Sequence, residues 1–108
     1  MNLDLSASDD GGRALLTLVG AVDVESRGQL QSACQKLLSE GPVGLVLDMS
    51  GVTFMDSTGV GALVEVSHNA QDLGITLTIR RPSARVTRIL QATSLIDVWD
   101  IEGDAASS

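Results

Sequence analysis

Aromatic side chains are almost absent from this chain of 108 residues, which contains one Phe, one Trp and no Tyr. Domains that bind single-stranded nucleic acid rely on rings that stack against bases, so the residues for that chemistry are missing. The net charge of −7 would also repel a phosphate backbone. We therefore expect no nucleic-acid partner and a core made of Val, Leu, Ile and Ala.

Cysteine and lysine each occur once, as Cys34 and Lys36. A single cysteine can form neither an internal disulfide nor a cluster of thiolate metal ligands, and at an apolar position it behaves as a small hydrophobic residue. Residues 59–61 (GVG) lack the Gly-Lys-Ser/Thr with which a P-loop holds nucleotide phosphates. We expect neither a metal nor another cofactor.

Targeting segments are also missing from the sequence. The opening residues, MNLDLSASDD, lack the basic and then apolar segments of a signal peptide. No apolar run approaches the ~20 residues that cross a bilayer. We therefore expect a soluble cytoplasmic protein with no membrane partner.

Apolar spacing divides the chain into strands and helices. Apolar residues recur every three or four positions in residues 26–40, as in an amphipathic helix, whereas residues 43–49 form a short apolar run typical of a strand buried on both faces. Residues 50–55 are predicted to be a loop. The other predicted elements are strands at 2–6, 13–20, 75–80 and 97–101 and helices at 57–73 and from Ser83 onward. The order β-β-α-β-α-β-α-β predicts an α/β domain with a mixed sheet of four to five strands and helices packed on it.

The length predicts one domain, over residues 1–102, followed by a disordered polar tail at 103–108. One side of the helix at 57–73 is predicted to pack on the sheet because apolar or small residues recur along it. These residues are Val60, Leu63, Val64, Ser67, Ala70 and Leu73.

The segment MDSTGVG, residues 55–61, joins a strand-like run to a helix-like one. It places two hydroxyls, Ser57 and Thr58, directly behind Asp56, and all three are common helix-capping types. A serine nucleophile would need a base, but the single histidine, His68, lies about 16 Å farther along the same predicted helix at 1.5 Å per residue. We therefore expect no enzymatic activity.

A metal-bound phosphoacceptor is a rival interpretation, because Asp48 ends the buried strand and could approach Asp56. Response-regulator receivers build such a Mg²⁺ pocket from an acidic pair after the first strand and a lysine late in the chain. Here the late strand has no lysine. The early acidic residues Asp4, Asp9 and Asp10 lie before or within a predicted hairpin rather than at a crossover between strands. These differences argue against a metal site.

The segment LVLDMSGVTFMDSTGVGALVEV, residues 45–66, resembles the signature of the STAS-domain anti-anti-sigma factors, in which Met-Asp-Ser-Ser/Thr-Gly opens a helix. Residues 20–30 (GAVDVESRGQL) resemble the Gly-Glu-Leu-Asp segment of that family, with Ala21 in place of the usual Glu. Residues 82–99 resemble its third helix and last strand. The resemblance covers almost the whole chain, and the departure at Ala21 concerns the detail of docking rather than the fold.

The resemblance implies a partner-switching protein. In this family the unphosphorylated protein binds an anti-sigma factor that is itself a serine kinase, and so frees a sigma factor. Phosphorylation ends the complex, and a PP2C-type phosphatase restores it. The implied phosphoacceptor is Ser57, with Thr58 as the second choice. The implied contact surface comprises Asp23, Asp56, Ser57, Thr58 and Gly59.

An alternative within the same family stays open. A STAS subunit without a sigma factor, such as a scaffold or a transporter-associated module, would use the same helix without phosphorylation. In either case we expect a monomer or a weak homodimer.

Overall fold

The computed structural model describes residues 2–103 of the chain. Within that range five strands form a sheet in the order β1-β2-β3-β4-β5, antiparallel between β1 and β2 and parallel between the other neighbours. The elements are β1 (Leu3–Asp10), β2 (Arg13–Val22), α1 (Arg27–Ser39), β3 (Gly44–Met55), α2 (Ser57–Asp72), β4 (Thr76–Arg80), α3 (Ala84–Ala92) and β5 (Asp100–Glu102). The predicted α/β class, mixed sheet and element order are confirmed.

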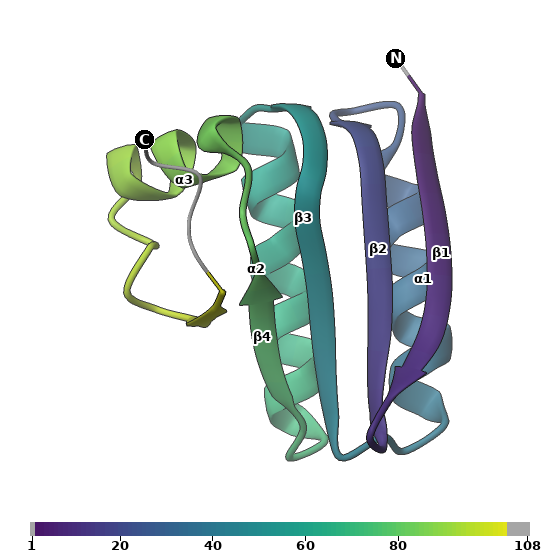
Figure 1. Ribbon diagram of the computed structural model, residues 1–108. Helices are drawn as coiled ribbons and strands as arrows, with labels where there is room; N and C mark the ends of the chain where they lie inside the picture. Colours follow the sequence, from purple (N-terminus) through teal and green to yellow (C-terminus); the bar gives the residue numbers. More distant parts are fainter. Residues whose placement is uncertain (1, 104–108) are drawn as a thin grey trace.

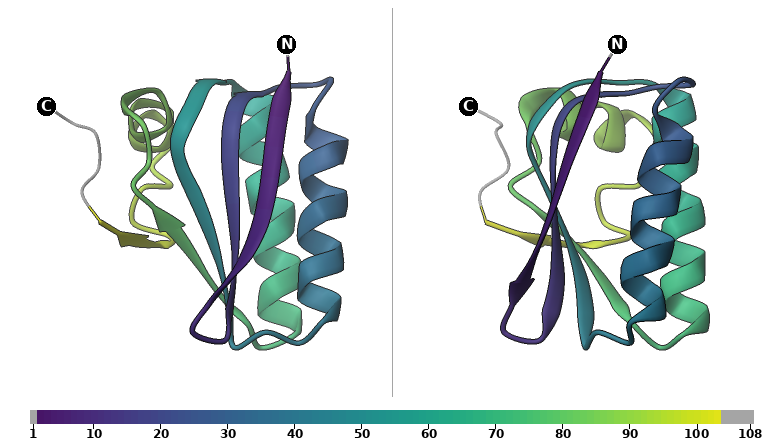
Figure 2. Two further views of the ribbon diagram at one scale, coloured as in Figure 1. Left: turned by 45° about the vertical axis from the view of Figure 1, so that its right-hand side comes forward. Right: turned by 90° about the vertical axis from the view of Figure 1, so that its right-hand side faces the viewer.

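The helices are distributed unevenly around the sheet. Helices α1 and α2 lie side by side on one face, whereas α3 lies beside the upper end of β3 in Figure 1 (Figures 1 and 2). Each of α1 and α2 is the crossover between two parallel neighbours, β2 to β3 and β3 to β4. None of the helices in residues 2–103 is long and apolar enough to cross a membrane.

The core between the sheet and these helices is almost entirely aliphatic. Its largest fully buried side chains include Leu16, Leu18, Leu30, Leu45, Leu47 and Leu63. Trp99 is the buried aromatic residue, and its indole N–H donates to the Ser67 hydroxyl at 2.7 Å. Burial raises the pKa of the Cys34 thiol to about 12, so this cysteine acts as the small hydrophobic residue that the sequence predicts.

Strand β3 is longer than its apolar run, and the predicted loop at residues 50–55 is wrong. The register between β2 and β3 shifts twice. Thr17 pairs with Asp48 and Val19 with Gly51, and then Gly20 pairs with Val52 and Ala21 with Phe54, so each shift leaves one extra residue in β3 as a bulge. Pairing resumes after each bulge and ends with Val22 opposite Met55. The Ser-Gly pair that suggests a turn therefore marks a bulge, and the strand continues to the start of α2.

The outer strands also differ from their predicted bounds. Strand β1 continues to Asp10, so the turn shrinks from the predicted residues 8–12 to Gly11 and Gly12, whose positive φ angles of 62° and 91° suit a two-residue hairpin turn. Strand β5 begins at Asp100 rather than at residue 97, after a turn that directs Trp99 into the core. Residues 104–108 of the predicted tail lie outside the described residues.

Asp48 joins β3 to the turn that precedes α3. Its carboxylate is buried and accepts hydrogen bonds from the Arg81 guanidinium at 2.5 Å and from the Ser50 amide and hydroxyl at 3.1 and 2.8 Å. Burial alone would raise the pKa of Asp48, but these donors outweigh it and hold the pKa below its ordinary value. The carboxylate is therefore used to hold the fold together.

The apolar side of α2 is rotated slightly from the predicted one. Leu63 is fully buried, as predicted, and Val66 and Ala62 are buried beside it. Leu73, placed on the same side by its spacing, is 59% exposed because the helix ends at Asp72 and the chain turns away toward β4. The prediction for Leu73 is therefore wrong.

The pair of leucines gives a matched test of this packing. Leu63→Ala should lower the free energy of unfolding by about 2–5 kcal/mol, because it removes buried methyl groups and leaves a cavity. Leu73→Ala should change it by less than about 0.5 kcal/mol, as is usual for surface positions. Urea melts of both variants measure these values, and equal losses would contradict the observed orientation of α2.

Candidate functional site

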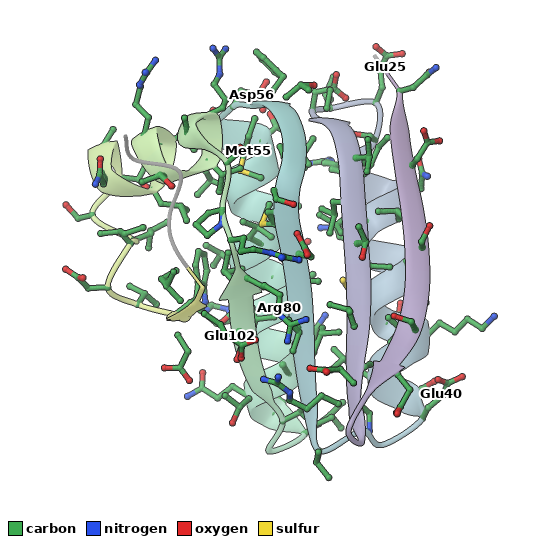
Figure 3. The ribbon with its side chains drawn as sticks, viewed as in Figure 1. Glu25, Glu40, Met55, Asp56, Arg80 and Glu102 are labelled. Atoms are coloured by element: carbon green, nitrogen blue, oxygen red, sulfur yellow. The ribbon has the colours of Figure 1, made fainter. Side chains whose placement is uncertain are left out.

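The segment Asp56–Gly59 lies at the carboxyl end of β3, where α2 begins. The parallel strands β2 and β3 end at the same edge of the sheet, so the loop after β2 reaches the same region. Figure 3 shows Met55 and Asp56 at the upper end of the molecule and Glu25, from the loop after β2, at the same end. The topology therefore brings together two segments that are more than thirty residues apart in sequence, at the edge where α/β sheets commonly carry their sites.

Asp56 is the N-cap of α2. One of its carboxylate oxygens accepts hydrogen bonds from the Thr58 and Gly59 amides at 3.0 and 3.2 Å, and its carbonyl accepts from the Val60 amide at 3.0 Å. The two side-chain bonds satisfy amides that the helix itself leaves without partners, and the carbonyl accepts the first bond of the helix. The Asp56 side chain is therefore bound to the helix start and fixes the direction of the residues that follow.

Ser57 is the first residue of α2, and its side chain is exposed. Within residues 2–103 its hydroxyl makes no hydrogen bond to another group of the protein. Thr58, its neighbour, is half-buried. Of the two adjacent hydroxyls, the one at Ser57 is the more accessible to another protein.

Gly59 brings α2 against the end of β2. A Cβ atom at this position would lie 2.7 Å from the Val22 carbonyl oxygen and 2.9 Å from Cγ of Met55. Glycine is therefore the residue that this contact requires. Gly59 is buried, so its part in a contact surface is to place Ser57 and Thr58 rather than to touch a partner.

The loop after β2 is built around Asp23, which is only 7% exposed. Its carboxylate accepts from the amides of Glu25 and Ser26 at 3.0 and 3.1 Å, while the Ser26 hydroxyl donates to the Ala21 carbonyl at 2.7 Å. Burial raises the pKa of Asp23, but the donors from Ser26 and Glu25 outweigh it and keep the pKa below its ordinary value. Asp23 is thus positioned to shape the loop.

The outward side chains of this loop are Val24 and Glu25. Val24 is 68% exposed, so this loop presents an apolar side chain to solvent. It is not among the residues predicted from the sequence, although an apolar residue between two acidic ones in a turn is a signal for it. Val24 and Glu25 are therefore the exposed side chains at the turn of this loop.

The structure gives no support to the two catalytic alternatives. His68 is exposed on the same helix as Ser57, eleven residues later, so the two side chains are about 16 Å apart along the axis. Asp48 is bound by Arg81 and Ser50, and Asp56 is bound by the α2 amides. In the described part of the chain no group of three or more His, Cys, Asp or Glu could hold a metal ion.

Two glycines on α2 test the close contact at the site. Gly59→Ala should destabilise the protein by about 1–3 kcal/mol, because the added methyl group meets a backbone carbonyl that cannot move easily. Gly61→Ala should be neutral or stabilise it by about 0.5–1 kcal/mol, because a Cβ there meets nothing within 4 Å. Thermal and urea melts decide, and a Gly59→Ala variant as stable as Gly61→Ala would show that the helix does not pack this closely.

Known proteins with related sequences and structures match nearly the whole chain. The chain is 28% identical over 101 residues to the anti-sigma-B factor antagonist of Bacillus subtilis, covering 94% of this chain and 92% of that protein. An anti-sigma factor antagonist from Mycobacterium paratuberculosis has the same fold, with a TM-score of 0.80, 20% identity and coverage of 94% of this chain and 86% of the other.

The phosphorylated form of the Bacillus cell fate determinant SpoIIAA also has this fold. Its TM-score is 0.71 at 17% identity, covering 96% of this chain and 92% of that one. The family model of the STAS domain matches residues 5–106. The chain therefore belongs to the STAS domain family.

Proposed function

We propose that this protein is an anti-sigma factor antagonist that is switched by phosphorylation of Ser57. In the proposed cycle the unphosphorylated protein binds an anti-sigma factor with serine kinase activity, which releases a sigma factor. The kinase then phosphorylates Ser57, and a PP2C-type phosphatase removes the phosphate. The observation that carries the proposal is the exposed Ser57 hydroxyl at the start of a helix whose cap, Asp56, is already bound.

The names of related proteins support the proposal. The relative from Bacillus subtilis is named as an antagonist of an anti-sigma factor. SpoIIAA, which shares the fold, has been solved in a phosphorylated form. An anti-sigma factor partner and a phosphorylated state are therefore both found among proteins of this fold, and we extend them to this chain.

The position of Ser57 favours a phosphate that leaves the fold intact. A phosphoserine adds about −1.5 to −2 charges at neutral pH. The start of α2 carries the positive end of the helix dipole, which stabilises nearby negative charge. Because Asp56 already accepts from the Thr58 and Gly59 amides, the phosphate need not displace the cap. We therefore expect the domain to stay folded after phosphorylation.

The effect of the phosphate should instead fall on the partner. A partner that covers Ser57 would also approach Thr58, Asp56 and the outward residues of the Asp23 loop, which lie at the same end of the sheet. A phosphate placed there adds bulk and a second negative charge beside Asp56. Burying uncompensated charge in an interface costs several kcal/mol, so the complex would dissociate.

Two substitutions of Ser57 separate the loss of the hydroxyl from the gain of charge. Ser57→Ala should bind the anti-sigma kinase within a few-fold of the original protein, because it removes only a small neutral group. Ser57→Asp should weaken binding roughly a hundredfold or more, because it adds a carboxylate at the contact. Ser8→Asp is the control, since it adds the same charge at an exposed position on β1.

Calorimetric titration of each variant into the kinase measures these affinities, and thermal melts confirm that each variant is folded. A folded Ser57→Asp variant that binds as tightly as Ser8→Asp would contradict the proposal. Binding without any phosphate transfer from ATP to Ser57 would instead favour a scaffold or a transporter-associated subunit. Phosphate transfer to Thr58 instead of Ser57 would show that Thr58 is the regulatory phosphorylation site.

A further inference from the structure

Positive charge is concentrated in one part of this acidic chain. Residues 73–96 contain no Asp or Glu but include Arg80, Arg81, Arg85 and Arg88. This segment therefore carries a formal charge of +4, while the rest of the chain carries −11. Such separation creates a local positive potential on a protein whose overall field is negative.

Two of the four arginines are used to hold the fold. Arg80 pairs with Asp10 at 2.8 Å and with Glu102 at 2.5 Å, and Figure 3 shows Arg80 and Glu102 side by side. Arg81 pairs with the buried Asp48 at 2.5 Å. The positive charge of these two side chains is therefore largely balanced within the domain.

Arg85 and Arg88 are different. Both are exposed, and they lie three residues apart on α3, so they share one face of the helix. The opposite face of α3 buries Val86 and Leu90 in the core, which fixes the helix on the sheet. In the described part of the chain neither arginine has an ion pair with an acidic residue. We call this face, with Arg85 and Arg88, the α3 basic surface.

The α3 basic surface lies at the same end of the sheet as Ser57. The Arg85 guanidinium is 5.0 Å from the centre of the Phe54 ring, and Phe54 is three residues before Ser57. The Ser83 amide, at the start of α3, donates to the Met49 carbonyl of β3 at 3.1 Å. Figures 1 and 2 agree that α3 and the start of α2 lie at one end of the sheet. A protein that covers Ser57 would therefore meet α3 as well.

We propose that the α3 basic surface binds an acidic patch on the anti-sigma kinase, as a second contact beside Ser57; this inference rests on the function proposed above. Arginine held over an aromatic ring is partly desolvated and oriented, so it loses less entropy on pairing with a carboxylate. Complementary charges at an interface speed association and reject wrong partners. The surface would thus select the cognate kinase and orient it toward the serine.

A protein partner fits this surface better than a nucleic acid. The two arginines of the α3 basic surface neutralise few phosphates, and the chain outside residues 73–96 carries −11. A short acidic patch on a folded partner can pair with Arg85 and Arg88 alone and need not contact the acidic surface of the rest of this protein. An aromatic platform for bases is also lacking, since Phe54 and the buried Trp99 are the two aromatic residues of the chain.

Charge reversal on α3 tests the inference against a matched control. Arg88→Glu and Arg85→Glu should each weaken binding to the purified anti-sigma kinase by about tenfold in low salt, mainly through slower association. Lys36→Glu changes the charge equally at an exposed position late in α1 and should alter affinity by less than about twofold. The difference should shrink between about 50 mM and about 300 mM salt, because added ions screen exposed charges.

Surface plasmon resonance with the kinase immobilised gives the rates, and thermal melts check that each variant is folded. If the two arginine variants bind like Lys36→Glu while Ser57→Asp fails to bind, the α3 contact is refuted and the proposed function stands. If the original protein binds no kinase-type anti-sigma factor, both proposals fail. Arg88-dependent binding of the original protein to a single-stranded RNA oligonucleotide would also overturn the inference.

Discussion

The contact between Gly59 and the end of β2 is the constraint on which the rest of the site depends. A Cβ atom at this position would lie 2.7 Å from the Val22 carbonyl oxygen, so the third residue of α2 has to be a glycine. The contact requires β3 to reach Met55, because only then does Asp56 cap the helix beside β2. Two bulges lie within β3 before it reaches Met55. Local strand pairing thus determines where the first hydroxyl of α2 points.

The acidic and hydroxyl groups of the site have separate tasks. Asp23 and Asp56 face backbone amides and hold the loop and the helix start in place. Ser57 points outward and, within residues 2–103, makes no hydrogen bond to the protein. A charge added to Ser57 therefore changes the surface without removing a bond that the fold uses. This separation is what would let a regulatory phosphate act on binding alone.

The spacing of apolar residues predicted the helices and the element order correctly. Amphipathic spacing predicted α1 and α2, and the run Asp-Ser-Thr-Gly at residues 56–59 predicted where α2 begins. The length of β3 was not predictable, because Ser50 and Gly51 are typical of turns and only pairing with β2 makes them a bulge. Spacing also could not show that Leu73 lies past the helix end. The burial of Asp23 was not predictable either, because it depends on hydrogen bonds from the amides of its own loop.

The arginines of α3 were visible in the sequence as an acid-free segment, but their significance was not. Arg80 and Arg81 look equivalent to Arg85 and Arg88 until the structure pairs the first two with Asp10, Glu102 and Asp48. Those acids come from β1, β5 and β3, at sequence distances that no local pattern reveals. Which charges remain available for a partner is a property of the folded chain.

In the proposed cycle a phosphate on Ser57 acts locally on a fold that does not change. Amide proton–nitrogen correlation spectra, recorded before and after phosphorylation by the anti-sigma kinase, test it most directly. We expect a large shift of the Ser57 amide and smaller shifts confined to its neighbours in residues 56–60 and in the loop at 23–26. An unshifted Ser57 amide, or shifts spread through β2, β3 and the buried face of α2, would contradict it.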